Sequence, residues 1–96
     1  MEILKVANIW KTYVEDQFVL KNVQLTLNEA EFVSLEGRSG AGKSTLLRIV
    51  GLLEKMDRGG LDLFGQATNG LSEKQCARLR LEKIRFVFQS LNLIPH

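Results

Sequence analysis

The stretch that decides the fold reads Gly37-Arg38-Ser39-Gly40-Ala41-Gly42-Lys43-Ser44-Thr45. It fits the pattern G-x-x-x-x-G-K-[ST], in which a glycine-rich loop joins a strand to a helix. The mostly apolar run 32–35 in front of it predicts the strand. Apolar residues recur between Leu46 and Leu53 at the spacing of a helical stripe, which predicts the helix. The pattern therefore stands in the context in which it can work.

The glycines of this loop let the backbone curl, so that successive N–H groups face an anion. A helix beginning near Lys43 adds the positive end of its dipole. In such a loop Lys43 reaches the β- and γ-phosphates of a nucleotide, and the Ser44 hydroxyl holds Mg²⁺. The alternative is a glycine-rich turn that binds nothing. Because a chance match in so short a chain is rare, we predict that residues 37–45 bind a nucleotide.

Composition limits the class of protein. The chain has 96 residues, 45% hydrophobic and 25% charged, which are ordinary values for one small globular domain. Its 13 basic and 11 acidic residues are interspersed, which argues against a nucleic-acid surface. The single cysteine, Cys76, has no partner for a disulfide within the chain and suits a reducing compartment. No secretory signal is evident and no apolar stretch approaches the ~20 residues of a membrane span, so we expect a cytoplasmic chain without membrane insertion.

Spacing and turn chemistry predict the other elements. An antiparallel β portion is expected before the loop, with a polar turn at 13–17. The pattern Ser72-x-x-Gln75 is typical of a capping box and predicts a helix after it. Strands are predicted around 3–9, 19–27, 61–65 and 84–88. Trp10, Tyr13 and Phe18 gather around the first turn, either as packing beneath a hairpin or as a flat surface for a purine ring.

The segment from Phe86 to His96, which reads FVFQSLNLIPH, closely resembles the Q-loop region of ATP-binding-cassette (ABC) transporter ATPases. The similarity extends along the whole chain, including residues 4–13, 19–23 and 31–33 and the loop with its helix. Residues 51–53, with Leu71-Ser72 and the run 77–80, are most similar to the subfamily for lipoprotein release and macrolide or peptide export. Two departures are the turn Glu29-Ala30-Glu31, usually Pro-Gly-Glu, and Arg38 in place of proline.

The resemblance implies an α/β P-loop NTPase fold. Residues 1–96 would be the N-terminal portion of one ABC-type ATP-binding domain: an antiparallel β portion, the P-loop strand and helix, and a Q-loop strand, with the core sheet incomplete. It implies that Tyr13 stacks on adenine, and that Gln89 touches Mg²⁺ and the attacking water. Lys43 and Gln89 would then be the catalytic residues, and Ser44 and Gln89 the metal ligands. The implied cofactors are ATP and Mg²⁺.

The resemblance also implies partners. A transmembrane permease subunit would dock on the Q-loop region just after Gln89, and a second ATP-binding subunit would complete the parent protein. The chain would thus lie at the cytoplasmic side of the inner or plasma membrane.

Several parts of the family's catalytic machinery follow the Q-loop and are not found in this sequence: the Leu-Ser-Gly-Gly-Gln signature, the acidic Walker B strand with its glutamate, and the switch histidine. The run 71–75 imitates the signature but has Glu73 and Lys74 where glycines are needed, and 57–60 imitates a GTPase motif without a preceding apolar strand. His96 is interpreted as a surface residue. Since phosphoryl transfer needs complete positioning, we expect no meaningful turnover from the chain alone.

The order of strands in the family's sheet leads to a further expectation, about the folding of the chain alone. In the family the strands at 32–35 and 84–88 are separated by strands that come later in sequence. Parallel strands must be paired along their edges, so we expect that the chain alone does not form the core sheet as a stable monomer.

Three functions remain open from the sequence. The first is the Mg-ATP-binding part of a transporter ATPase that energises export or extraction, and the second is a non-catalytic module that engages a transporter subunit. The third is another P-loop enzyme, such as a kinase or GTPase. Tyr13 before the loop and Gln89 after it disfavour the third.

Overall fold

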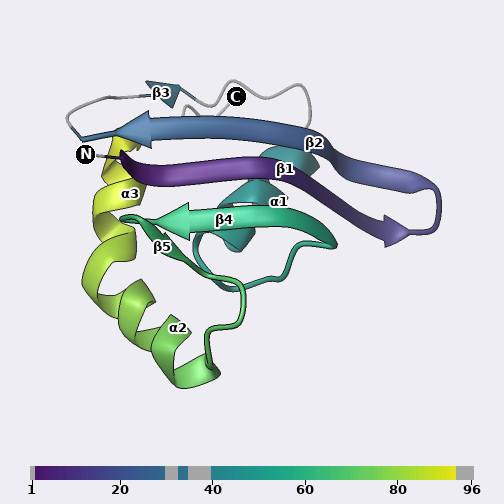
Figure 1. Ribbon diagram of the computed structural model, residues 1–96. Coiled ribbons are helices and arrows are strands. Elements are labelled where there is room, and N and C mark those ends of the chain that lie inside the picture. The colour runs from purple at the N-terminus through teal and green to yellow at the C-terminus, as the bar shows by residue number, and fades with distance from the viewer. Residues whose placement is uncertain (1, 30–32, 35–39, 93–96) are drawn as a thin grey trace.

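A four-stranded antiparallel sheet is the largest part of the fold (Figure 1). The computed structural model describes residues 2–29, 33–34 and 40–92. The sheet has the order β2-β1-β4-β5, with β1 (Glu2–Val14), β2 (Gln17–Asn28), β4 (Arg58–Leu63) and β5 (Gln66–Ala67). A separate parallel pair consists of β3 (Val33–Ser34) and β6 (Leu91–Asn92). The helical elements are α1 (Gly40–Val50), α2 (Glu73–Leu79), the π-helical turn η1 (Arg80–Ile84) and α3 (Arg85–Ser90).

The long hairpin of β1 and β2 confirms the antiparallel portion predicted before the loop. Its strands extend further than predicted and leave only Glu15 and Asp16 as the turn. In β1 Leu4 and Val6 are buried and Lys5 between them is exposed, as the alternation of a strand requires. An irregularity at Asn8, where φ is 52°, resets this alternation, so that Ile9 is buried rather than Asn8.

A hydrophobic core lies between the sheet and the helices. On α1, residues three and four positions apart face the sheet, namely Leu46, Ile49 and Val50. They lie in one buried cluster with sheet residues that share the same face, namely Leu4, Val6, Ile9, Leu27, Leu61 and Leu63. The helix predicted after the loop is confirmed. It ends at Val50, however, so Leu53 lies beyond it and is 67% exposed, not on the apolar stripe where it was predicted.

Two local motifs position the elements that follow α1. Phe64 and Gly65 form the two-residue connection between β4 and β5, and their φ values of 53° and 79° are those of a tight hairpin turn. The predicted capping box is confirmed, because Gln75 N–H donates to the Ser72 hydroxyl and Ser72 N–H donates to Gln75 Oε1. None of the described helices has the length and apolar character needed to cross a membrane.

The strand predicted over 84–88 is wrong, because these residues are helical, at the end of η1 and in α3. Alternation would bury Phe86 with Ile84, but Phe86 is 56% exposed, while Ile84 and Val87, three positions apart, are both buried. Among the described strands, the parallel pairing reaches only two residues each in β3 and β6. A helix satisfies its backbone groups within the segment, so the segment folds as a helix where no long neighbouring strand pairs with it.

Candidate functional site

The glycine-rich stretch enters the structure at Gly40, where α1 begins. Gly37, Arg38 and Ser39 lie outside the described residues, so the structure describes only Gly40 to Thr45, in the first turns of the helix. The helix thus begins three residues earlier than the start expected near Lys43. Lys43 is half-buried, Ser44 is exposed and Thr45 is buried. The two side chains expected to meet phosphate and metal therefore lie in the N-terminal half of the helix, where the dipole is positive, with Ser44 open to solvent and Lys43 partly covered.

The donor set suits Mg²⁺ held together with a nucleotide. Among the described residues no group of three or more His, Cys, Asp or Glu side chains can hold a metal ion. Mg²⁺ in nucleotide sites takes few protein ligands and keeps phosphate oxygens and waters around it. The exposed hydroxyl of Ser44, at a helix start, fits that role.

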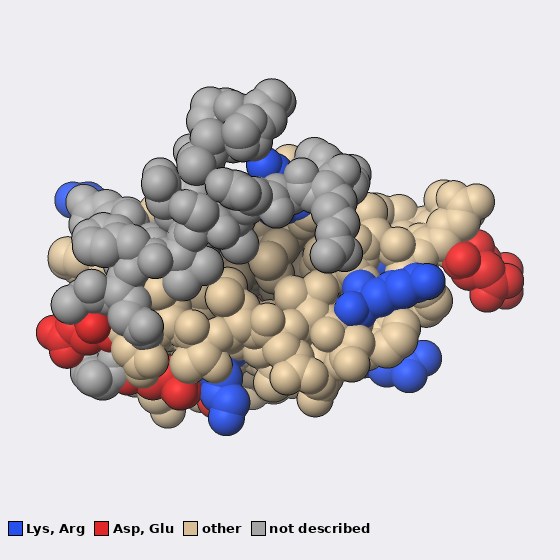
Figure 2. Space-filling view, turned by 90° about the horizontal axis from the view of Figure 1, so that it is seen from above, with Lys and Arg blue, Asp and Glu red and all other residues tan. Residues whose placement is uncertain are grey.

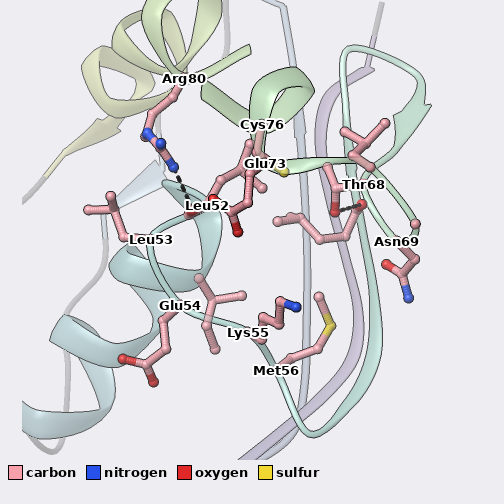
Figure 3. Close-up of a pocket in the computed structure, with 14 residues that line it drawn as sticks. Leu52, Leu53, Glu54, Lys55, Met56, Thr68, Asn69, Glu73, Cys76 and Arg80 are labelled. Carbon is pink, nitrogen blue, oxygen red and sulfur yellow. Dashed lines mark hydrogen bonds between the residues drawn. The ribbon is translucent and has the colours of Figure 1, made fainter. Parts of the chain in front are cut away.

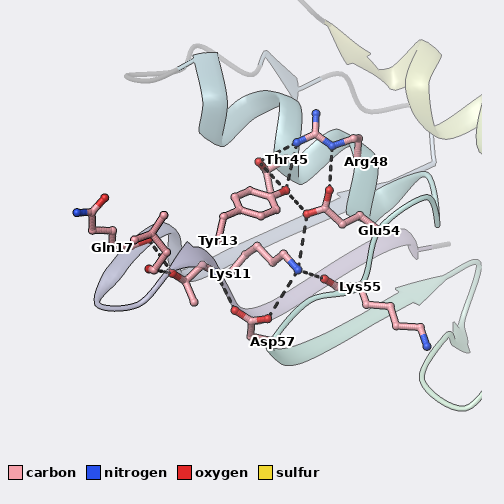
Figure 4. A network of polar contacts seen from close by, with 10 residues as sticks. Lys11, Tyr13, Gln17, Thr45, Arg48, Glu54, Lys55 and Asp57 are labelled. Atoms are coloured by element: carbon pink, nitrogen blue, oxygen red, sulfur yellow. Dashed lines mark hydrogen bonds and ion pairs between the residues drawn. The ribbon is translucent and has the colours of Figure 1, made fainter.

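Tyr13 lies beside the first turns of α1, although it is 32 residues from Thr45 in the sequence (Figure 4). Its hydroxyl is 3.4 Å from Thr45 Oγ1 and donates a hydrogen bond to Glu54 Oε2. The Arg48 guanidinium donates to the Tyr13 hydroxyl over 3.2 Å and to Thr45 Oγ1 over 3.2 Å. Tyr13 is nevertheless 56% exposed. The ring is therefore anchored at its hydroxyl end and open to solvent over much of its surface.

Arg48 and Glu54 form an ion pair behind the tyrosine. Arg48 Nε donates to Glu54 Oε1 over 3.0 Å. The hydrogen bond from Tyr13, followed by that from Arg48, holds the pKa of Glu54 below its ordinary value of 4.5. Hydrogen bonds with Tyr13 and then with Glu54 raise the pKa of Arg48. Both groups are thus charged at neutral pH.

Lys11 extends the network to the other end of the loop that follows α1. Its ammonium nitrogen is 3.7 Å from Glu54 Oε2 and 3.7 Å from Asp57 Oδ1, and it donates to the carbonyl oxygen of Lys55 over 2.8 Å. The same nitrogen lies 5.3 Å from the centroid of the Tyr13 ring, within the range of a cation–π contact. The Lys11 ammonium group therefore lies close both to the Tyr13 ring and to the Glu54 carboxylate, which accepts the hydrogen bond of the Tyr13 hydroxyl.

Asp57 fastens this loop to β1. Its carboxylate accepts from the Thr12 N–H over 2.7 Å, and its own N–H donates to the Trp10 carbonyl over 2.9 Å. Asp57 therefore has a structural role, consistent with rejecting 57–60 as a GTPase motif. Trp10 packs edge-on against Phe18 with centroids 5.3 Å apart. Of the three aromatic residues near the turn, these two pack together, while Tyr13 turns to α1.

Gln89 lies near the end of α3, and its side chain is outside the described part of the chain. Its predicted place at the end of a strand is wrong, because the segment is helical. Phe88, one residue earlier, lies close to Gly51, which comes just after the C-terminus of α1. A Cβ atom on Gly51 would be 3.2 Å from the Phe88 ring. Lys43 and Ser44 are the fourth and fifth residues of that 11-residue helix. The expected contact of Gln89 with the metal and the attacking water stays a prediction.

A cleft of about 810 Å³ opens on the far side of the loop after α1 (Figure 3). Apolar side chains such as Ile49, Leu61 and Leu71 line it together with the Arg80 side chain, which donates to the Leu52 carbonyl over 2.7 Å. None of the predicted site residues that the structure describes lines it. On the face seen in Figure 2, basic side chains lie at several separate places and acidic ones lie toward the two ends of the view, so the visible residues form no large patch of one charge.

Sequence reasoning missed Lys11, Arg48, Glu54 and Asp57. Arg48 follows Thr45 by three residues, a spacing that places both on one helix face, so this neighbour was open to prediction. Lys11 and Glu54 meet Tyr13 only through the fold, since the contact between Tyr13 and Glu54 spans 41 residues of sequence. No local pattern marks such a pair.

Comparison with known proteins decides the family. A family model described as "ABC transporter" matches residues 20–96. The chain belongs to the ABC transporter family. This confirms the resemblance drawn from the Q-loop region, and relatives named for lipoprotein release and for macrolide export are both among the matches.

Two relatives and one solved structure show the extent of the similarity. The chain is 44% identical over 96 residues to the uncharacterized ABC transporter ATP-binding protein MJ0796 of Methanocaldococcus jannaschii, covering 97% of this chain and 41% of that protein. It is 40% identical over 94 residues to the lipoprotein-releasing system ATP-binding protein LolD of Cytophaga hutchinsonii, covering 98% and 42%. The dimeric structure of the ATP-binding cassette MJ0796 bound to ADP and Pi matches with a TM-score of 0.72 at 40% identity, covering 81% of this chain and 35% of that one. The chain thus spans about two fifths of the length of these relatives.

Proposed function

We propose that this ABC-family chain is the Mg-ATP-binding part of a transporter ATPase that energises export across, or extraction from, a membrane. One observation carries the proposal: Tyr13 and the helix that opens with the glycine-rich stretch lie together, with the Tyr13 hydroxyl 3.4 Å from Thr45. An exposed aromatic ring beside a phosphate-binding helix start is the arrangement that an adenine nucleotide needs. The ADP and Pi in the matching MJ0796 structure support this choice of ligand.

In this proposal each site residue has one task. Residues 37–45 cradle the phosphates, Lys43 pairs with the β- and γ-oxygens, and Ser44 provides the hydroxyl ligand of Mg²⁺. Tyr13 receives the adenine on its exposed ring. Gln89, near the end of α3, contacts Mg²⁺ and the attacking water.

The proposed partners follow from the family. A permease subunit would contact the Q-loop region, and a second ATP-binding subunit would complete the nucleotide site, with the chain on the cytoplasmic side of the membrane. LolD is named as part of a lipoprotein-releasing system and MJ0796 is described as dimeric, which supports both expectations. Binding of ATP is the step that we propose for these residues, since turnover in the family also needs the signature motif and the Walker B glutamate that follow the Q-loop.

A titration with a fluorescent ATP analogue in the presence of Mg²⁺ tests the function. We expect saturable binding by the wild type and loss of about tenfold or more in affinity for Lys43→Ala, because that change removes a charge-assisted contact to phosphate. Lys5→Ala, a change of the same charge at an exposed position of β1, is the matched control and should bind as the wild type does. Equal, negligible binding by wild type and Lys43→Ala would refute the proposal.

The second candidate function, a non-catalytic module that engages a transporter subunit, is favoured by the cleft of Figure 3. Its volume of about 810 Å³ and apolar floor suit a side chain or short segment of a partner. This function predicts that Lys43→Ala leaves binding to a permease unchanged, whereas the ATPase function predicts that ATP alters that binding.

A further inference from the structure

The hydroxyl of Tyr13 is held by charged side chains from outside its own strand. Glu54 accepts its hydrogen bond, and Arg48 donates to the same oxygen over 3.2 Å. Arg48 and Glu54 are joined to each other at 3.0 Å, so the three groups close a triangle (Figure 4). A bond made by a charged partner is stronger than one between neutral groups. The tip of the ring is therefore fixed from two sides.

Glu54 also influences one face of the Tyr13 ring, through its ion pair with Lys11. Lys11 lies 5.3 Å from the ring centroid and 3.7 Å from Glu54 Oε2. Glu54 thus holds the hydroxyl directly and holds the cation that lies over the ring. A cation on the ring occupies that face, which leaves the opposite face for a flat ligand.

We propose that Glu54 is a positioning residue for Tyr13: together with Arg48 and Lys11 it fixes the orientation of the ring that receives the base of a bound nucleotide. The proposal rests on the proposed function, because it assigns a determinant of affinity to that site. A tyrosine at an exposed position otherwise has rotamer freedom that stacking on a base would remove. A ring fixed beforehand loses less entropy when the base binds, so Glu54 contributes to the affinity for the base and not to that for the phosphates.

The test compares ATP with inorganic tripolyphosphate, which offers the phosphates without a base. We expect Glu54→Ala and Tyr13→Phe each to weaken ATP binding about three- to tenfold, the range of one lost hydrogen bond. Both should leave the tripolyphosphate affinity unchanged, and the double variant should be no weaker than either alone. Glu54→Gln, whose amide oxygen still accepts the hydrogen bond from Tyr13, should retain most of the ATP affinity that Glu54→Ala loses. Glu15→Ala removes the same charge from the exposed turn two residues from Tyr13 and should bind ATP like the wild type.

A second measurement does not depend on nucleotide binding. The chain contains one tyrosine, so labelling with ¹³C-tyrosine reports the Tyr13 ring alone. We expect its NMR signals in Glu54→Ala, but not in Glu15→Ala, to move toward those of free tyrosine. Unchanged ring signals, or an equal loss of ATP and tripolyphosphate affinity in Glu54→Ala, would overturn the positioning role. Absence of ATP binding by the wild type, with the ring signals moving as expected, would refute the proposed function and leave Glu54 as the group that fixes the ring.

Discussion

Gly59 is the residue on which the irregularity in the middle of β1 depends. Its φ of 109° lies in the region that side chains rarely adopt. A Cβ atom there would lie 2.5 Å from the carbonyl oxygen of Asn8 and 2.7 Å from that of Ala7. The close approach of two backbones thus requires glycine, and it is this approach that lets Ile9 turn into the core.

We predict that Gly59→Ala lowers the free energy of unfolding by about 2 kcal/mol or more, because it adds backbone strain and a clash with main-chain atoms. Gly60→Ala is the matched control, since a Cβ there meets nothing within 4 Å. It should change the free energy of unfolding by less than about 1 kcal/mol. Urea unfolding followed by the fluorescence of Trp10 measures both. Equal effects of the two substitutions would contradict this account.

Single residues were predictable where a local pattern carries the chemistry. Lys43 and Ser44 follow from the glycine spacing, and Tyr13 follows from the family resemblance. The surroundings of Tyr13 were not predictable, because Lys11 and Glu54 are 43 positions apart in the sequence numbering and meet only in the folded chain. Contacts of this kind depend on the register of β1 against the loop after α1, which no single segment encodes.

The helical segment α2-η1-α3 differs most from what its residues favour locally. Ile84 to Phe88 is rich in β-branched and aromatic residues, which predicts a strand. The helical form instead buries Leu79, Ile84 and Val87 against the core. Burial along one face thus outweighs a propensity scale that spans only about 1 kcal/mol.

We predict that Val87→Ala is more destabilising than Phe86→Ala, although it removes fewer atoms. Val87 is fully buried and its truncation should lower the free energy of unfolding by about 2 kcal/mol, whereas Phe86, at 56% exposed, should cost under about 1 kcal/mol. Denaturant unfolding of the two variants measures the difference. The reverse order would show that this segment is a strand in solution.

Elements with a repeated pattern or a defined cap were predicted well. The hairpin of β1 and β2, the helix α1 and the capping box of α2 each follow from alternation, helical spacing or the pair Ser72 and Gln75. The segment 84–88 was not, because its strand form requires pairing partners that its own residues do not specify.

For the molecule as a whole, the network around Glu54 connects the sheet to the helical layer. Lys11 and Tyr13 belong to β1, Arg48 belongs to α1, and Glu54 lies in the loop that follows. A change at one carboxylate is therefore expected to affect how the two layers hold together.

We predict that this connection weakens in acid. The folded-state pKa of Glu54 lies below its ordinary 4.5, so its contribution is fully present above that value and is lost as the pH falls through the folded pKa. The free energy of unfolding of the wild type should exceed that of Glu54→Gln near neutral pH, and the difference should shrink below about pH 4. Urea unfolding at pH 7, 5 and 3 measures it. A difference that is constant over this range would contradict a role for the charged carboxylate.

The α/β class and the antiparallel portion of the whole fold were predictable from the sequence. The parallel part was less predictable, because the described pairing is between β3 and β6, and β6 begins three residues after the end of the segment 84–88 that was predicted as a strand. That the chain alone does not form the family's core sheet as a stable monomer stays a prediction.

The strand β1 is bonded on both sides over most of its length. It pairs with β2 as far as Val14 and with β4 as far as Trp10, and Asp57 then takes the Thr12 N–H. The main chain on both sides of Tyr13 is thus hydrogen-bonded within the fold. A ligand that binds there does not have to order this segment of backbone. We therefore expect its binding to cost little conformational entropy of the main chain and to move the backbone little.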